Sequence, residues 1–248
     1  MTTIIEATNV SKSYGSGPAR VQALKDINLI IRSGELTVLM GPSGSGKTTL
    51  LSILGCMLAP TGGTARVCGV STSGARPEEL ATIRRQHIGF VFQSYHLFST
   101  LTAAENVQLA LDVRGERGPK PVAKTKEILA SVGLSSKMGS FPRQLSGGEQ
   151  QRVAIARAIV AGPSAILADE PTAALDSANG QAIMAILSAI AKERDRAVLV
   201  VTHDPRLFGF ADRIVTIEDG SLTREDLTDL NKSAGGGGVR SLGGRGAG

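Results

Sequence analysis

Tryptophan is absent from this chain, and its 248 residues include only two cysteines, three histidines and 3% aromatic residues. The apolar residues form short aliphatic runs rich in Val, Ile, Leu and Ala. Such runs favour buried parallel strands covered by helices over an aromatic-rich β-sandwich. The length suits one large α/β domain or a domain with a subdomain, with enough residues to bury a sizeable core.

The cysteines and the apolar runs exclude several classes of protein. Cys56 and Cys68 match neither a metal-ligand spacing nor a CxxC redox motif, so we expect reduced, buried thiols, as in cytosolic proteins. The first residues do not resemble a secretory signal. No window holds the roughly 18 consecutive apolar residues that a membrane span needs. We therefore expect a cytoplasmic chain that reaches a membrane only through a partner.

A long run of like charges is also missing. The chain has 27 Lys and Arg against 22 Asp and Glu, for a net charge of +5. That balance alone would permit a nucleic-acid or membrane-surface partner. Because the basic residues are scattered, we prefer a solvated surface as the interpretation, with a polyanion-binding patch as the alternative.

Apolar periodicity predicts strands that alternate with helices. Residues 3–10 and 26–32 alternate between apolar and polar, which indicates antiparallel strands. Further strands are predicted at 36–40, 64–70, 88–92, 165–168, 197–202 and 213–218, and this last strand precedes the turn EDG. Helices are predicted at 48–57 and 180–194. This order indicates an α/β fold with a mostly parallel, doubly wound sheet and an N-terminal antiparallel part.

The strand pattern disappears between Ser94 and Ala161, where helical stretches are predicted at 103–113, 122–132 and 149–160. We interpret 94–161 as a helical subdomain inserted into an α/β core made of 1–93 and 162–230. The glycine-rich segment 231–248 is too poor in apolar residues to fold, and we expect a disordered tail.

The segment GPSGSGKT is a phosphate-binding loop, because it matches G-x-x-x-x-G-K-[ST] between a predicted strand and a predicted helix. Its backbone N–H groups and the helix N-terminus would surround an anion. Lys47 would reach the β- and γ-phosphates and the Thr48 hydroxyl would ligate Mg²⁺. The predicted nucleotide-binding set is Gly41, Pro42, Ser43, Gly44, Ser45, Gly46, Lys47, Thr48 and the next residue, Thr49.

Acidic and imidazole side chains follow two other predicted strands. Asp169 and Glu170 end the strand in AILADEPT, and His203 ends the strand in AVLVVTHD. Ligands of doubly wound sheets bind at the carboxyl ends of the strands. We assign Asp169 to the metal, Glu170 to the attacking water as general base, and His203 to the γ-phosphate or that water. His87 and His96 lack such a placement and are taken as structural or surface residues.

The segment LSGGEQQR begins another predicted helix. Ser146 and Glu149 have the spacing of a capping box. Capping does not explain Gly147 and Gly148, because glycine in a helix costs up to about 1 kcal/mol relative to alanine. Bare glycines at a helix N-terminus would let an anion approach closely. A cap alone and an anion site both remain open on these residues.

Taken in order, GPSGSGKT, LSGGEQQR, LADEPT, AALD and VTHD resemble the motifs of ABC (ATP-binding cassette) transporter nucleotide-binding subunits, over about residues 4–225. The resemblance implies a phosphate-loop NTPase fold, with ATP and Mg²⁺ as cofactors. It also implies that two chains pair head to tail around two ATP molecules. Ser146, Gly147 and Gly148 would then contact the ATP bound by the opposite subunit.

The same resemblance assigns further residues. Tyr14 would stack on adenine, with a packed surface tyrosine as the alternative. Gln93 would contact Mg²⁺ or the attacking water and is counted with the catalytic residues. Asp176 would communicate across the dimer. Ala173 departs from the family pattern, because many members have Ser or Gly there.

Within the family, the motifs look most like the stand-alone ATPases of lipoprotein-release and macrolide-efflux systems. This implies a second ATPase subunit, most simply in a homodimer, an integral-membrane permease and a periplasmic adaptor, with no nucleic acid. The chain would lie on the inner face of the cell membrane, and the permease would dock near Ser94–Asn106. Two alternatives are a soluble ABC ATPase acting on nucleic acid or ribosomes, and a small-molecule phosphotransferase. The latter would leave LSGG and the Asp-Glu pair unexplained.

Overall fold

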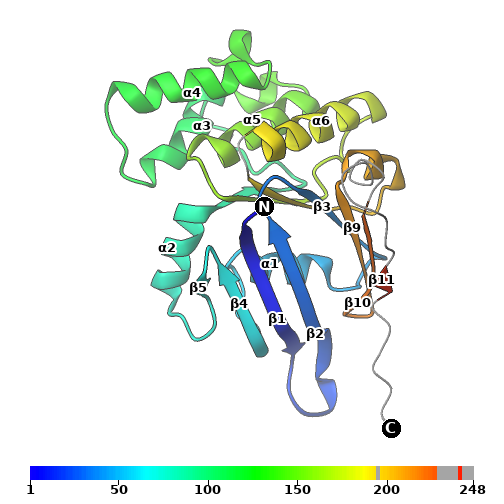
Figure 1. Ribbon diagram of the computed structural model, residues 1–248. Coiled ribbons are helices and arrows are strands. Elements are labelled where there is room, and N and C mark those ends of the chain that lie inside the picture. Colours follow the sequence, from blue (N-terminus) through cyan, green and yellow to red (C-terminus); the bar gives the residue numbers. More distant parts are fainter. Residues whose placement is uncertain (194–195, 228–239, 242–248) are drawn as a thin grey trace.

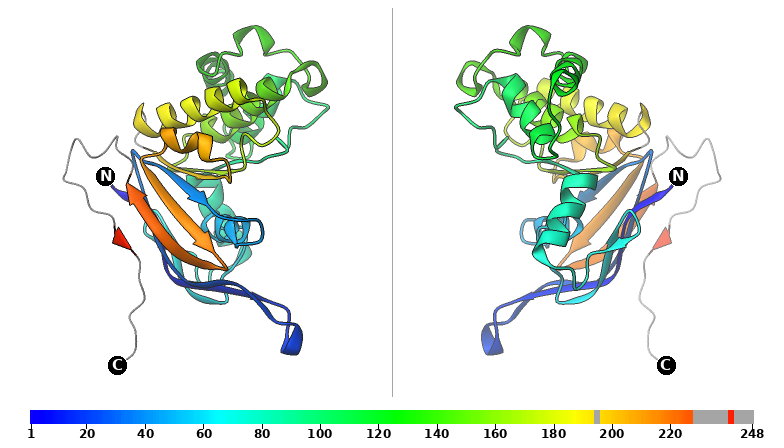
Figure 2. Two further views of the ribbon diagram at one scale, coloured as in Figure 1. Left: turned by 90° about the vertical axis from the view of Figure 1, so that its right-hand side faces the viewer. Right: turned by 90° about the vertical axis from the view of Figure 1, so that its left-hand side faces the viewer.

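The computed structural model describes residues 1–193, 196–227 and 240–241, and it contains two β-sheets. The smaller sheet is antiparallel, with the order β2-β1-β4-β5. Its strands are β1 (Thr3–Tyr14), β2 (Val21–Arg32), β4 (Gly62–Val67) and β5 (Val70–Ser71). The predicted N-terminal antiparallel strands are confirmed, and they extend several residues further into a long hairpin (Figures 1 and 2).

The larger sheet has the order β11-β10-β9-β3-β8-β7-β6, and the strands from β9 to β6 are mutually parallel. The mostly parallel sheet is therefore confirmed. Its strands are β3 (Leu36–Met40), β6 (Ile88–Val91), β7 (Ala165–Asp169), β8 (Ala197–Val201), β9 (Arg213–Glu218), β10 (Ser221–Leu227) and β11 (Arg240–Ser241).

The large sheet separates two apolar cores, because alternate residues of its strands face opposite sides. Ile166 and Ala168 belong to the core beneath the upper helices, whereas Leu167 belongs to the core shared with the small sheet. Helix α1 (Lys47–Leu54) lies between the two sheets, and α6 (Ser177–Glu193) covers the other face with the helices of 94–161 (Figure 1).

The segment 94–161 contains helices and no strand. It forms α3 (Ala103–Asp112), α4 (Pro119–Ser131) and α5 (Gly147–Val160), with 3-10 turns at Ser135–Lys137 and Pro142–Gln144. These helices lie together on one side of the large sheet (Figure 2). Buried residues of α3 and α5 share one apolar core with β7 and β8, so packing continues across the proposed subdomain boundary. The boundaries themselves stay a prediction.

The sequence analysis missed helix α2 and strand β10, because both are polar. Helix α2 (Pro77–His87) buries only Ile83, so its sequence has no apolar stripe. Strand β10 contains Arg224, Glu225 and Asp226 in succession and is held by antiparallel pairing with β9. The predicted strand at 213–218 is confirmed as β9, and β10 follows it after the turn at 219–220. The predicted tail, 231–248, lies outside the described residues apart from Arg240–Ser241, which pair with β10.

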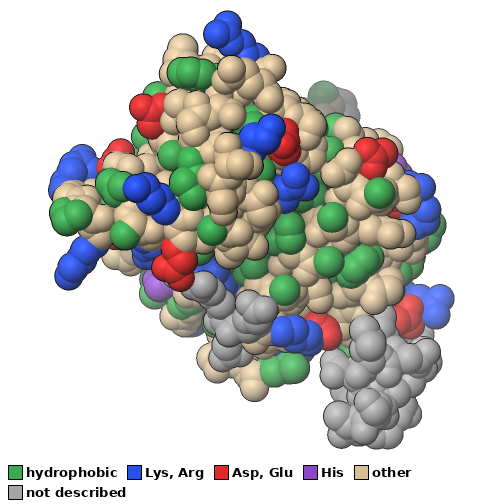
Figure 3. All heavy atoms as spheres, turned by 90° about the horizontal axis from the view of Figure 1, so that it is seen from above, with side chains coloured by type: hydrophobic (Ala, Val, Ile, Leu, Met, Phe, Trp, Pro, Cys, Tyr) green, Lys and Arg blue, Asp and Glu red, His purple; other side chains and the backbone are tan. Residues whose placement is uncertain are grey.

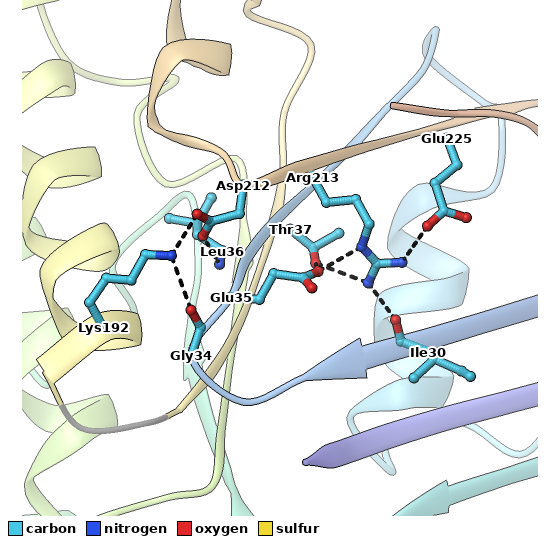
Figure 4. Close-up of polar contacts among 9 residues, drawn as sticks. All are labelled: Ile30, Gly34, Glu35, Leu36, Thr37, Lys192, Asp212, Arg213 and Glu225. Atoms are coloured by element: carbon cyan, nitrogen blue, oxygen red, sulfur yellow. Dashed lines mark hydrogen bonds and ion pairs between the residues drawn. The ribbon is translucent and has the colours of Figure 1, made fainter. Parts of the chain in front are cut away.

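A buried arginine joins the two sheets (Figure 4). The Arg213 side chain, on β9, is 3% exposed and donates to Glu35 Oε1 at 2.6 Å and to Glu225 Oε1 at 3.0 Å. It also donates to the Thr37 hydroxyl at 3.2 Å and to the carbonyl oxygen of Ile30 on β2. The guanidinium group thus connects β2, β3, β9 and β10 through charge-assisted hydrogen bonds.

A second ion pair, between Lys192 and Asp212, lies near the Arg213 cluster (Figure 4). Lys192 Nζ, at the end of α6, lies 2.6 Å from Asp212 Oδ1, and the other Asp212 oxygen accepts the backbone N–H of Leu36 at 2.8 Å (Figure 4). Helix α6 is thereby attached to the start of β3. On the face above the helices, Lys and Arg side chains alternate with Asp and Glu, so this face carries mixed charge (Figure 3).

The two cysteines are free thiols, as predicted. Cys56 is buried, and its burial raises the thiol pKa to about 11, so the reactive thiolate is scarce at neutral pH. Cys68 is half-buried in the turn between β4 and β5.

Candidate functional site

The phosphate loop lies between β3 and α1 and forms one wall of a pocket of about 640 Å³. Gly41 passes so close to β9 that a Cβ there would lie 2.1 Å from the carbonyl oxygen of Ile217. Gly46 has φ +102°, which few residues other than glycine adopt. The pocket is lined by Ala23, Pro42, Ser43, Gly44, Gly46, Lys47, Thr48, Thr49, Gln93, Asp169, Glu170, Ala173, Val201 and His203.

Lys47 and Thr48 begin α1 at this pocket. The Lys47 ammonium donates to the carbonyl oxygens of Gly41 at 2.8 Å and Pro42 at 2.7 Å, which holds the charge over the loop. The Thr48 hydroxyl donates to Asp169 Oδ2 at 3.3 Å. The structure therefore brings together an ammonium, a hydroxyl and a carboxylate that stand far apart in the sequence.

The Asp169 carboxyl lies at the end of β7, and burial raises its pKa. The Glu170 charge also raises this pKa, whereas the Thr48 hydrogen bond and Lys47 oppose the shift. Among the described residues, no cluster of three His, Cys, Asp or Glu side chains could hold a metal by itself. Hydroxyl, carboxylate and amide oxygens from Thr48, Asp169 and Gln93 fit Mg²⁺, which usually completes its shell with phosphate oxygens and water.

Glu170 and His203 form a pair on the same side of the pocket. Glu170 Oε1 lies 2.8 Å from His203 Nδ1, and the glutamate side chain is 17% exposed against 70% for the histidine. Glu170 has a left-handed backbone with φ +47°, and its N–H donates to the carbonyl oxygen of Val201 at 2.9 Å. This unusual conformation turns Glu170 away from the strand direction of Asp169. Two carboxylates adjacent in sequence therefore have different partners.

Tyr14 lies outside the residues that line the pocket. Its side chain, at the end of β1, is exposed, and its hydroxyl oxygen lies 3.5 Å from Thr49 Oγ1. The Lys12 ammonium lies 5.3 Å from the ring centroid. The ring is thus near the phosphate loop, with its hydroxyl beside that of Thr49.

Ser146, Gly147 and Gly148 also lie outside the pocket lining. The predicted capping box is present. The Glu149 N–H donates to Ser146 Oγ at 3.3 Å, and the Ser146 N–H donates to Glu149 Oε2 at 2.8 Å. The latter hydrogen bond lowers the pKa of the Glu149 carboxyl, and Lys137, 3.3 Å away, contributes. The start of α5 thus supplies a capped helix N-terminus but no residue that lines the nucleotide pocket of its own chain.

One residue of the pocket, Ala23, had no signal in the motifs. It comes from β2 and lines the pocket through its place in the antiparallel sheet. Val201 ends β8 as the first residue of VTHD, so the strand prediction and that motif both indicate its place. His87 and His96 lie outside this pocket: His87 Nδ1 is 3.4 Å from Ser164 Oγ, and His96 packs on Phe92.

Comparison with known proteins places this geometry in a family. A family model described as ABC transporter matches residues 24–173. The macrolide export ATP-binding/permease protein MacB of Salmonella paratyphi A is 50% identical over 222 residues, and the Escherichia coli K12 protein of the same name is 44% identical over 224. Each alignment covers 90% of this chain but 34% of the relative, so the chain spans about a third of their length.

Solved structures that resemble this chain indicate the same family. A dimeric post-hydrolysis state of the ATP-binding cassette MJ0796, bound to ADP and Pi, has a TM-score of 0.82 and 43% sequence identity. Another dimeric structure of MJ0796, described as a bacterial ABC transporter cassette, has the same TM-score and 44% identity. The first of these matches covers 90% of this chain and 98% of the cassette. In the part of this chain that the structure describes, no helix is long and apolar enough to span a bilayer. The chain therefore belongs to the ABC transporter family, as an ATP-binding cassette ATPase of the phosphate-loop fold.

Proposed function

We propose that this chain is the ATPase motor of an exporter and works with a membrane permease. The printed name of the relative MacB, a macrolide export protein, is our guide to the substrate class. The observation that carries the proposal is one shared pocket. The phosphate loop, the Thr48–Asp169 pair and the Glu170–His203 pair all line it.

The residues of the pocket would have separate roles in phosphoryl transfer. Lys47 and the N-terminus of α1 would hold the phosphates. Thr48, Asp169 and Gln93 would hold Mg²⁺, which neutralises charge on the phosphates. Glu170 would accept the proton of the attacking water. Its hydrogen bond with His203 keeps the carboxylate in place and lets the imidazole respond to the γ-phosphate.

Two chains would be needed for each complete site. Ser146, Gly147 and Gly148 lie at the start of α5, where Ser146 is exposed and Gly148 is buried, and outside their own nucleotide pocket. A helix N-terminus attracts an anion through its free N–H groups and dipole. We therefore assign this loop and Asp176 to the ATP of a second copy in a homodimer, and Tyr14 to the adenine ring. The dimeric state of the similar MJ0796 cassettes supports this assignment.

The permease would dock beside the segment that follows Gln93. A groove of about 780 Å³ runs between α2, β6, α3 and α5, and Phe98 and Val113, 54% and 60% exposed, lie along it. Its apolar floor and its rim of Arg84, Arg85 and Arg114 suit an amphipathic helix with acidic residues. Such docking would hold the chain on the inner face of the membrane. On the opposite side, the permease would work with a periplasmic adaptor.

Replacing Glu170 by Gln tests the proposal. The amide keeps the size of the side chain but cannot take the proton, so turnover should fall by about 100-fold or more while ATP binding persists. Sedimentation with Mg²⁺ and ATP should then show a stable dimer of Glu170→Gln. The control is Glu127→Gln at an exposed position of α4, which should retain wild-type turnover. A Glu170→Gln chain that stays monomeric at saturating ATP would contradict the shared site.

A further inference from the structure

Each glycine at the start of α5 faces a side chain of its own protein. A Cβ at Gly147 would lie 2.9 Å from the hydroxyl oxygen of Tyr95 and 3.4 Å from Leu175 Cδ2. A Cβ at Gly148 would lie 2.6 Å from Oδ1 of Asn179. Separations below 3.0 Å require a neighbour to move, so alanine at either position would displace the Tyr95 hydroxyl or the Asn179 amide from its present place. Within one chain, side chains of Tyr95 and Asn179 thus occupy the space that an alanine side chain would need at these positions.

Tyr95 stands two residues after Gln93, which lines the nucleotide pocket. Its backbone has a left-handed φ of +59°, and its carbonyl oxygen accepts a hydrogen bond from Arg157 Nη2 at 2.8 Å. Arg157 lies near the far end of α5. The loop after Gln93 is therefore held to α5 by Arg157, and its phenol lies beside Gly147.

Asn179 stands three residues after Asp176, in the first turn of α6. Asp176 accepts the Asn179 backbone N–H at 2.8 Å and its Nδ2 group at 2.7 Å, and these hydrogen bonds lower the Asp176 pKa. Because Asp176 holds the amide nitrogen, the amide oxygen is the atom that faces Gly148. The orientation of Asn179 thus depends on the loop that begins at Ala173, another residue of the nucleotide pocket.

We propose that the space left free at Gly147 and Gly148 accommodates the side chains of Tyr95 and Asn179, and we call these two contacts the Gly147 and Gly148 seats. The loop after Gln93 and the loop that begins at Ala173 border the chain's own ATP. Through the two seats, these loops position Ser146–Gly148, which the chain presents to its partner's ATP. The inference rests on the proposed function, in which Ser146–Gly148 serve a second copy. It makes Tyr95 and Asn179 positioning residues that couple the two ATP sites of a dimer, since a shift of either loop must move α5 or open a gap.

The Gly148 seat is tested by a rescue experiment in the full-length chain. Gly148→Ala should lower kcat about tenfold or more, and adding Asn179→Ala should restore it to within about twofold of Asn179→Ala alone. The matched control is Gly148→Ala with Asn179→Leu, which keeps the bulk and should stay impaired. ADP titration of each variant verifies that the monomer still folds and binds nucleotide.

The Gly147 seat has an equivalent test. Tyr95→Phe removes only the hydroxyl oxygen, and the next atom of the side chain, Cζ, lies 3.9 Å from where the Cβ of an alanine at 147 would be, an ordinary contact. Gly147→Ala should therefore be impaired in the wild-type background and recover with Tyr95→Phe. If neither glycine variant is rescued, the bare positions are required by the partner's ATP and the seats are disproved.

Coupling predicts an effect that a purely structural role would not produce. Asn179→Ala should lower the Hill coefficient for ATP toward about 1 with unchanged ADP affinity. A variant that retains wild-type cooperativity would overturn the coupling. Dimerisation of Glu170→Gln distinguishes failure of the seats from failure of the proposed function. If that dimer forms and the rescues fail, only the seats are wrong, whereas absence of the dimer rejects the proposed function itself.

Discussion

Asp169 carries its carboxyl group in a place that is partly withdrawn from water. Burial raises its pKa even though Thr48 donates a hydrogen bond and Lys47 lies nearby. Without a counter-ion, the charged form is thus disfavoured in the folded protein. The adjacent Glu170 adds like charge, so this end of β7 is suited to a cation. Function here opposes stability, as is common at sites that bind charged ligands.

Asp169→Asn should therefore stabilise the nucleotide-free protein at neutral pH while lowering ATPase activity about 100-fold. The sign of this stability change follows from the linkage between proton binding and folding. A carboxyl whose folded pKa is raised contributes most stability at pH values below its unfolded pKa, and this contribution is lost as the pH rises through the folded pKa. The gain in melting temperature for Asp169→Asn should thus be larger at about pH 8 than at about pH 4. A variant that melts lower than wild type at the higher pH would contradict this explanation.

Secondary structure in this chain was predictable where burial imposes a pattern. The strand at Leu36–Met40 and the strand at Arg213–Glu218 have the bounds that their apolar residues indicate. The start of α5 follows from the Ser146–Glu149 capping box. Helix α2 and strand β10 were not predictable, because polar residues give no periodic signal when tertiary contacts hold an exposed element. Pairing and packing, rather than local sequence, decide such elements.

Arg213 is expected to be essential for the junction of the two sheets. Arg213→Met would leave the Glu35 carboxylate buried without its partner, which should cost about 3–5 kcal/mol of unfolding free energy. Replacing Glu35 by Met as well removes the orphaned charge and should recover most of this loss. Urea unfolding of both variants checks the expectation. If the double variant is no more stable than Arg213→Met, the hydrogen bonds to Thr37 and Ile30 matter more than the charge pair.

At the scale of the whole molecule, one chain presents an ATP pocket and, elsewhere, a helix N-terminus outside that pocket. If two copies exchange these parts, turnover must depend on concentration while nucleotide binding by one chain does not. The dimer would then be a two-state element that ATP closes and hydrolysis releases.

Dilution tests this arrangement without any mutation. Turnover per chain should fall in proportion to concentration once the protein is well below the dimer dissociation constant. ADP binding measured over the same range should stay constant. Constant turnover per chain down to nanomolar concentrations would mean that a single copy holds a complete site.

The sequence by itself determined the phosphate loop, the residues at the ends of the strands and the alternation of strands with helices. Each of these depends on a local pattern of glycine, charge or burial that folding does not alter. Three contacts became visible only once the chain was folded: Glu170 hydrogen bonds with His203, Arg213 joins two sheets, and Tyr95 and Asn179 occupy the space beside Gly147 and Gly148. These contacts join residues from different elements, and their geometry follows from packing the two sheets and the helices together, which no local pattern encodes.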